Sequence, residues 1–134
     1  MTPIFLLAAF ATLSSAPARA GVDYKCDSVR YEDQLTGWLR LDGADRGSVE
    51  MEFWNGYPPV ILVDAPISAA RATREGATDL VTEADRHNGT VATFTAPAGY
   101  ATADKFFAKI DMRYTSPENG KLRVMKYDLN CVRH

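Results

Sequence analysis

The clearest alternation of apolar and polar side chains lies near the end of the chain, in residues 105–131. Ile110, Met112 and Tyr114 are separated by charged residues, which is the period expected of a strand with one buried face. The same period returns further on, at Met125, Tyr127, Leu129 and Cys131. Between the two runs, residues 115–120 contain a proline that fixes φ and an Asn-Gly pair that tolerates positive φ. The pattern predicts a β-hairpin.

Shorter runs with strand character precede this hairpin. They cover residues 23–31, 38–41, 48–54, 60–63, 79–83 and 90–95. The Asn-Gly pairs at 55–56 and 88–89 are hairpin-turn signals. Together these segments make about seven or eight short strands, a number typical of a small antiparallel barrel or sandwich. We therefore expect an all-β fold, with a β-barrel as the first choice and an open sandwich as the second.

Residues 64–75 allow two interpretations. Pro66 stands near the start, two arginines near the end and Gly76 after them, in the order of helix start and stop signals. The apolar spacing, however, is weak for a helix. An irregular crossover or an edge strand is therefore the alternative to a short helix in this segment.

The beginning of the chain reads as a targeting segment. Residues 4–13 are a continuous apolar run that is too short to span a bilayer. No Lys or Arg precedes the run, but a small-residue cleavage site, Ala-Arg-Ala, follows it at 18–20. We expect a signal peptide at 1–20 and a single exported β-domain at 21–134, located in the periplasm or secreted. No later run has the length and apolar character of a transmembrane helix.

Export bears on the two cysteines, Cys26 in the first expected strand and Cys131 in the last. The envelope and the extracellular space permit thiol oxidation, which favours a Cys26–Cys131 disulfide that ties the first and last strands together. In the chain-entropy model, closing a loop of that size stabilises the fold by roughly 4–5 kcal/mol. Two unrelated buried thiols are the alternative. Export also makes Asn88, in Asn-Gly-Thr, a glycosylation acceptor where the source carries out that modification.

The charges argue against a nucleic-acid partner. Lys and Arg total 15, Asp and Glu total 17, and the formal net charge is −2. Both signs are interspersed along the chain, whereas a nucleic-acid-binding domain shows a basic patch or stripe. The same balance argues against strong binding to anionic lipid. We therefore expect neither nucleic acid nor a membrane surface as the ligand.

The residue types that carry catalysis form no familiar motif. The two histidines are His87, in a predicted turn, and His134, the last residue. Glu50 and Glu52 share a strand face, which a solvated outer surface explains more simply than paired catalytic carboxylates. The acidic turn at 42–47 offers too few ligands for calcium. We expect no enzymatic activity, no catalytic residue, no metal and no cofactor.

Residues 53–59, Phe-Trp-Asn-Gly-Tyr-Pro-Pro, are the best candidate for recognition. If Phe53 faces the core, alternation sends Trp54 outward at a turn, with Tyr57 shortly beyond it. Exposed aromatic side chains contribute a large contact area at little entropy cost. Tyr100, in an Ala-Pro-Ala-Gly-Tyr loop, is a candidate of the same kind. The alternative is that these aromatic residues cap the ends of the core.

The layout of the cysteines resembles that of a known family. Tyr24-Lys25-Cys26 near the start of the exported chain and Cys131 near its end are similar in placement to those of the periplasmic C-type lysozyme inhibitors. The resemblance implies a small antiparallel barrel tied by a disulfide between its ends. It covers only the two termini. The family's inhibitory Ser-Gly-x-x-Tyr signature is absent, since residues 98–100 do not reproduce its spacing, so no inhibitory residue is carried over and membership is not claimed.

These observations lead to three functional hypotheses. The first is a non-enzymatic exported protein that binds a protein partner in the envelope or outside the cell, for example as an inhibitor, through Trp54, Tyr57 and Tyr100. The second is a small barrel that carries an apolar or saccharide ligand, since eight strands are just wide enough to hold one. The third is a hydrolase with an unrecognised site. The sequence gives no oligomeric state.

Overall fold

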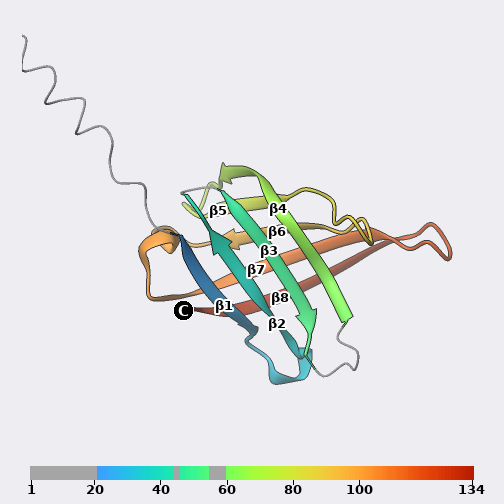
Figure 1. The fold of residues 1–134 in the computed structure, drawn as a ribbon, viewed down its shortest axis with the longest axis horizontal. Helices are drawn as coiled ribbons and strands as arrows, with labels where there is room; N and C mark the ends of the chain where they lie inside the picture. The colour runs from blue at the N-terminus through green and yellow to red at the C-terminus, as the bar shows by residue number, and fades with distance from the viewer. Residues whose placement is uncertain (1–20, 44–45, 55–59) are drawn as a thin grey trace, which may run out of the picture.

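The structure is a computed structural model, which describes residues 21–43, 46–54 and 60–134. Its eight strands form one closed antiparallel barrel (Figure 1). The strands are β1 (Val22–Ser28), β2 (Leu35–Leu41), β3 (Gly47–Phe53), β4 (Val60–Ala72), β5 (Thr78–Thr82), β6 (Val91–Ala96), β7 (Lys105–Thr115) and β8 (Leu122–Arg133). Two 3-10 helices, η1 (Tyr31–Asp33) and η2 (Tyr100–Thr102), lie in the connections. The expected signal peptide, Tyr57 and the turn at 55–56 lie outside the described residues.

Each strand pairs with the next one along the chain, and β1 also pairs with β8. This closure confirms the all-β fold and, of the two architectures expected, the barrel. The C-terminal hairpin is confirmed as well: β7 and β8 pair without a register shift from Lys105↔Val132 to Thr115↔Leu122. The β7–β8 pairing is also the longest in the described sheet.

Because successive residues of each strand point to opposite faces of the sheet, every second side chain points into the barrel, and many of these are large. The largest that are fully buried include Tyr24, Leu35, Leu39, Met51, Leu80, Phe94, Ile110, Met112 and Leu129. Phe53 and Tyr127 are partly buried and pack against this core. At Gly37 a Cβ would collide with the carbonyl of Glu50 and the side chain of Met51, so even this position has no room to spare. The lumen is therefore occupied by side chains of the protein itself, whose burial drives the barrel to close.

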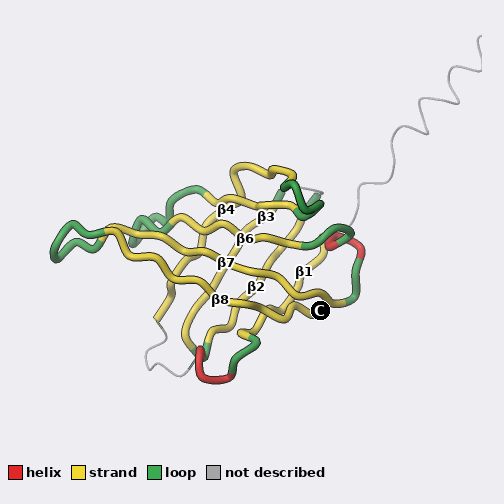
Figure 2. Tube along the Cα trace, turned by 180° about the vertical axis from the view of Figure 1, so that it is seen from behind, coloured by secondary structure: helices red, strands yellow, loops and turns green. Residues whose placement is uncertain are grey.

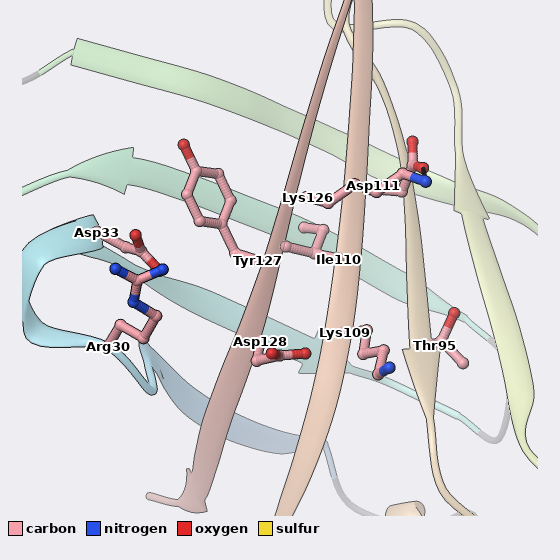
Figure 3. Close-up of a pocket in the computed structure, with 9 residues that line it drawn as sticks. All are labelled: Arg30, Asp33, Thr95, Lys109, Ile110, Asp111, Lys126, Tyr127 and Asp128. Atoms are coloured by element: carbon pink, nitrogen blue, oxygen red, sulfur yellow. Dashed lines mark ion pairs between the residues drawn. The ribbon is translucent and has the colours of Figure 1, made fainter.

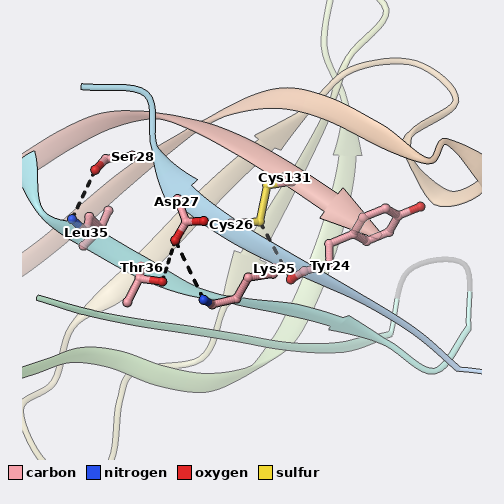
Figure 4. A network of polar contacts seen from close by, with 8 residues as sticks. All are labelled: Tyr24, Lys25, Cys26, Asp27, Ser28, Leu35, Thr36 and Cys131. Carbon is pink, nitrogen blue, oxygen red and sulfur yellow. Dashed lines mark hydrogen bonds and ion pairs between the residues drawn. A yellow bond between two sulfur atoms is a disulfide. The ribbon is translucent and has the colours of Figure 1, made fainter. Parts of the chain in front are cut away.

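The pairing of β1 with β8, which closes the barrel and is called the seam here, is stabilised by a covalent bond inside the barrel. Cys26 and Cys131 face each other across the pair and form a disulfide with an S–S distance of 2.10 Å. Both residues are fully buried. On the outer face, the Thr36 hydroxyl donates a hydrogen bond to Asp27 at 2.7 Å, and Lys25 lies 3.8 Å from the same carboxylate (Figure 4). The predicted disulfide is confirmed.

Most of the segment 64–75 is strand, so the helix interpretation is wrong. β4 continues to Ala72, pairing with β3 as far as Pro66 and with β5 from Ile67 onward. Pro66 has no N–H to donate, and it sits where the strand changes partners, a position that tolerates proline. Hydrogen bonds to two neighbouring strands outweigh the local helix signals. The strand alternative for this segment is the one that the structure contains.

A buried aspartate holds the turn between β5 and β6 against β4. The carboxylate of Asp85, which is 4% exposed, accepts hydrogen bonds from three backbone N–H groups. These belong to Asp64 at 2.8 Å, His87 at 2.7 Å and Asn88 at 3.0 Å. Burial raises the pKa of the Asp85 carboxyl, but the N–H donors lower it more, so the pKa lies below its usual value. The turn thus covers the part of β4 that β5 does not reach.

Candidate binding surface

Trp54 directly follows β3, and 45% of its surface is exposed. Its backbone N–H donates to the carbonyl of Gln34 at 2.9 Å, which holds the residue at one end of the barrel. Its ring centroid lies 5.5 Å from that of Tyr31, which is 74% exposed in η1. Trp54 therefore faces outward, as the alternation predicts. It does so as one member of an aromatic pair whose other member, Tyr31, the sequence did not single out.

Two aliphatic side chains at the start of β4 continue this exposed surface. Val60 and Ile61 are 51% and 56% exposed, and Val60 pairs with Phe53, the residue before Trp54. η1, the end of β3 and the start of β4 lie at the same end of the barrel (Figure 1). We call the four exposed residues here the aromatic end: Tyr31, Trp54, Val60 and Ile61. Exposed apolar side chains gathered in this way mark an interaction surface more often than scattered ones do.

A groove of about 320 Å³ opens beside the aromatic end. It is lined by Phe53, Val60, Ile61, Leu62, Asn88, Thr90, Tyr114 and Met125. Tyr114 and Met125 come from the β7–β8 hairpin, which reaches well beyond the rest of the sheet (Figure 2). The hairpin projects because β6 pairs with β7 only as far as Arg113 and β1 pairs with β8 only from Leu129 onward. The exposed Val60 and Ile61 and the half-buried Phe53 and Tyr114 thus border a largely apolar hollow.

A second, more polar cleft of about 410 Å³ crosses β6, β7 and β8 and reaches η1. It is lined by Arg30, Asp33, Thr95, Lys109, Ile110, Asp111, Lys126, Tyr127 and Asp128 (Figure 3). Burial and the negative charge of Asp33 raise the pKa of the Tyr127 hydroxyl. Asp111 is paired with Arg113 at 2.8 Å and with Lys126 at 3.8 Å. Among the residues that the structure describes, no three His, Cys, Asp or Glu side chains are placed to hold a metal ion.

The outer face of β7 carries an exposed aromatic residue that the sequence analysis missed. Phe107 is 71% exposed, and it borders an apolar groove of about 490 Å³. Val29, Ala77, Ala96 and Pro97 contribute to the same groove. The signal was present in the sequence: two consecutive phenylalanines in one strand must point to opposite faces, so one of Phe106 and Phe107 has to face outward.

Tyr100 belongs to the core and not to the surface, contrary to the expectation of an exposed aromatic. It is 7% exposed, and its ring centroid lies 6.2 Å from that of Phe106. The hydroxyl oxygen of the buried Tyr24 lies 2.8 Å from the carbonyl oxygen of Tyr100 and 2.7 Å from that of Ala103, so its single proton is shared between these two acceptors. A buried hydroxyl needs such acceptors, and they draw this loop over the end of the barrel. The alternative that Tyr100 caps the core is the one observed.

The outer face of β1–β3 carries a second group of polar and aromatic side chains. The guanidinium of Arg40 lies 4.6 Å from the ring centroid of Trp38, and the ammonium of Lys25 lies 5.7 Å from it. Arg40 also pairs with Asp23 at 3.1 Å and with Glu50 at 3.9 Å. Glu50 therefore takes part in an ion-pair network on the outer face of the barrel. Surface ion pairs of this kind contribute little to stability, in general no more than about 1 kcal/mol.

The turn at 85–90 contains the remaining candidates. His87 is exposed, and its backbone N–H is one of the three donors to Asp85. The side-chain amide of Asn88 donates to the carbonyl of Leu62 at 3.0 Å, and its oxygen accepts the N–H of Thr90 at 2.9 Å. The nitrogen to which a glycan would attach is therefore already used to join this turn to β4.

Comparison with protein-family models, with curated proteins and with solved structures finds no match to this chain. Across the described ranges, no helix is long and apolar enough to cross a membrane. The structure places exposed apolar side chains outside a barrel whose interior is filled.

Proposed function

We propose that this protein is a non-enzymatic binding protein that acts on a protein partner, and that the aromatic end is its contact surface. The observation that carries the proposal is the exposed Tyr31–Trp54 pair beside the exposed Val60 and Ile61. Aromatic residues dominate the free energy of binding at protein interfaces, because they remove a large apolar area from water with few rotatable bonds.

The filled lumen supports the same proposal. Met51, Ile110 and Met112 are each no more than 1% exposed inside the barrel, so its recognition surfaces lie on the outside. The groove beside Phe53 and Tyr114 can accept a side chain of a partner next to the aromatic pair. Val60 and Ile61 of the aromatic end line this groove, so an apolar side chain of a partner could enter it while the partner contacts the aromatic pair.

We further propose that the protein is exported and works in the periplasm or outside the cell. A buried disulfide is compatible with an oxidising compartment, where such bonds persist. An inhibitor of a partner protein would fit this setting. Such a protein has to be compact and durable, and it needs only one surface for its function.

The test compares capture of exported proteins from the source by the wild-type chain and by Trp54→Ala and Tyr31→Ala. Truncation of a hot-spot aromatic costs about 2 kcal/mol or more, which corresponds to roughly a 30-fold weaker Kd. Tyr31 is 74% exposed, so Tyr31→Ala should leave Tm unchanged, whereas Trp54 is 45% exposed and Trp54→Ala should lower Tm only slightly. Val132→Ala is the control, because this exposed apolar residue of β8 lies outside the aromatic end and lines none of the grooves described above, so its loss should leave capture intact. Lower Tm with unchanged capture would contradict the proposal and assign the aromatic pair to stability.

A second candidate function is supported by the groove at Phe107. Its volume of about 490 Å³ lies within the range of small-molecule sites, roughly 300–1,000 Å³, and its lining is mostly apolar. If the protein carries an apolar ligand, this outer groove would hold it, because side chains fill the lumen. Native mass spectrometry of the protein from its own source should then show a bound small molecule that Phe107→Ser releases. A ligand retained by Phe107→Ser would exclude this groove.

A further inference from the structure

One edge of β8 is paired with β7 along almost its whole length, whereas the other edge has a neighbouring strand along only part of its length. β7 pairs with β8 from Leu122 to Val132. On the other edge, β1 pairs with it only from Leu129 to Arg133, and the last hydrogen bond runs from the N–H of Val29 to the carbonyl of Asp128 at 2.9 Å. Beyond that point β1 gives way to η1, so residues 122–127 have no strand on this edge within the described chain.

The backbone groups that face this free edge can be identified. In an antiparallel strand, N–H and C=O of one residue point to the same side, and successive residues alternate. The Asp128 carbonyl points toward β1, whereas the N–H of Arg133 points the other way, to the carbonyl of Asp104 beside β7. Because β7–β8 shows no register shift, the N–H and C=O groups of Leu122, Val124 and Lys126 face the free edge. Such groups are a template for another strand.

Side chains along this edge suit a partner strand with apolar residues. Leu122 and Val124 are 59% and 43% exposed on the outer face. Met125 and Tyr127 are half-buried on the inner face. The cleft of about 410 Å³ is lined partly by Lys126 and Tyr127, and it reaches Arg30 and Asp33, which lie on the same side of β8 as Tyr127 (Figure 3). Part of this cleft therefore lies beside the free edge.

The projecting end of the β7–β8 hairpin, residues 111–126, is called the hairpin arm here. Its charge favours a partner segment of the opposite sign. Residues 111–126 carry four basic side chains and two acidic ones, and the acidic Asp111 pairs with Arg113 and Lys126. The arm is therefore still net basic, in a chain whose formal net charge is −2. A second copy would bring an equally basic arm to the same edge, which like-charge repulsion opposes. An acidic segment would be attracted to it.

We infer that the edge formed by residues 122–127 of β8 binds an extended acidic segment of the protein partner, which adds to the barrel sheet as a further strand. This inference rests on the proposed function and names the partner's recognition mode, β-strand addition. A segment of about six residues, about 20 Å long, would cover the free edge. Main-chain hydrogen bonds would supply its affinity, and acidic side chains would select it over basic ones.

The test uses a pool of synthetic hexapeptides in which glutamate alternates with apolar residues, and a matched pool with lysine in place of glutamate. The protein is the disulfide-bonded chain and its Val124→Pro variant. Proline at 124 removes an N–H from the free edge and none from the β7 ladder, a substitution that edge strands tolerate. Val124→Thr is the control. We expect the glutamate pool to bind the wild type and Val124→Thr, with a loss of at least about tenfold in Val124→Pro.

Two further measurements keep the result independent of folding effects in Val124→Pro. Amide hydrogen exchange should slow at Leu122, Val124 and Lys126 when the glutamate pool is added, while Arg123 and Met125, which face β7, do not change. Arg123→Glu should weaken binding of the glutamate pool without altering the fold. Absent binding, equal binding of the lysine pool, equal binding to Val124→Pro, or a dimer that Val124→Pro dissociates would each overturn the inference.

The inference and the proposed function can fail separately. If Trp54→Ala abolishes capture of the native partner while Val124→Pro captures it fully, the edge inference is wrong and the aromatic end stands. If Val124→Pro abolishes capture while Trp54→Ala has no effect, the edge is the contact surface and the aromatic end is not. If both variants capture normally, both proposals are wrong.

Discussion

The two halves of β8 differ in how the molecule uses the same strand. From Leu129 to Arg133 the strand has β1 on one side and β7 on the other, and a buried disulfide joins it to β1. From Leu122 to Tyr127 it has β7 alone. The first half satisfies its backbone within the barrel, and the second leaves backbone groups and exposed aliphatic side chains at an edge. The comparison separates a half that stabilises the fold from a half that is free to bind.

We call residues 129–133 of β8 the sealed half and residues 122–127 the open half. The largest predicted effect is on the sealed half. Replacing both cysteines, Cys26→Ala with Cys131→Ala, opens a loop of 105 residues in sequence. The chain-entropy model then predicts a loss of about 4–5 kcal/mol in the free energy of unfolding, a large share of the roughly 5–15 kcal/mol typical of a domain. Urea denaturation of the wild type and the double variant measures it. Alanine is preferred to serine because both sites are buried and a hydroxyl there would lack a partner.

The same variant sharpens the comparison between the two halves. Without the disulfide, amide exchange should accelerate at Asn130 and Val132, whose backbone groups face β1, and approach the rates at Val124. Val132→Ala is the control, since this exposed side chain should change stability by no more than about 0.5 kcal/mol. Unchanged urea midpoints in the double-alanine variant, or free thiols in the protein purified from its source, would show that the seam does not depend on the disulfide.

The sequence predicted the sealed half far better than the open one. Alternation at Ile110, Met112 and Leu129 identifies the inward face of the hairpin, because it depends only on the two-residue period of a strand. The disulfide could be predicted because the chain has only one pair of cysteines. The free edge could not, since it arises where β1 ends while β8 continues, and strand lengths on different parts of the chain are not encoded locally.

The errors have the same origin. Pro66 and Gly76 resemble helix boundaries, but pairing of β4 first with β3 and then with β5 decides that segment, and both partners are distant in sequence. Tyr100 looked like a loop aromatic, but the Tyr24 hydroxyl, 76 residues away, fixes its carbonyl at the end of the core. Phe107 was missed although its neighbour Phe106 made an outward aromatic necessary. Local patterns identify faces, while long-range pairing decides which faces and edges are covered.

β4 differs from β8 in this respect. The part of β4 that β5 does not pair with is covered by the turn that contains Asp85. Asp85→Asn keeps the shape but removes the charge that three backbone N–H groups share, and we expect a loss of about 1–3 kcal/mol at pH 7. This effect is smaller than that of the disulfide. Urea midpoints of the two proteins at neutral pH measure it, with the exposed neighbour Glu83→Gln as the control.

Acid should erase the difference in stability between the wild type and Asp85→Asn, in a defined direction. The pKa of the Asp85 carboxyl is lowered in the folded state, so its contribution to stability is complete above the unfolded pKa of about 3.9 and is lost as pH falls through the folded value. Stability of the wild type, measured by urea denaturation at a series of pH values, should therefore fall more steeply than that of Asp85→Asn below about pH 4. Parallel curves would mean that the three N–H groups bind a neutral acceptor equally well, and that the turn closes β4 by shape and not by charge.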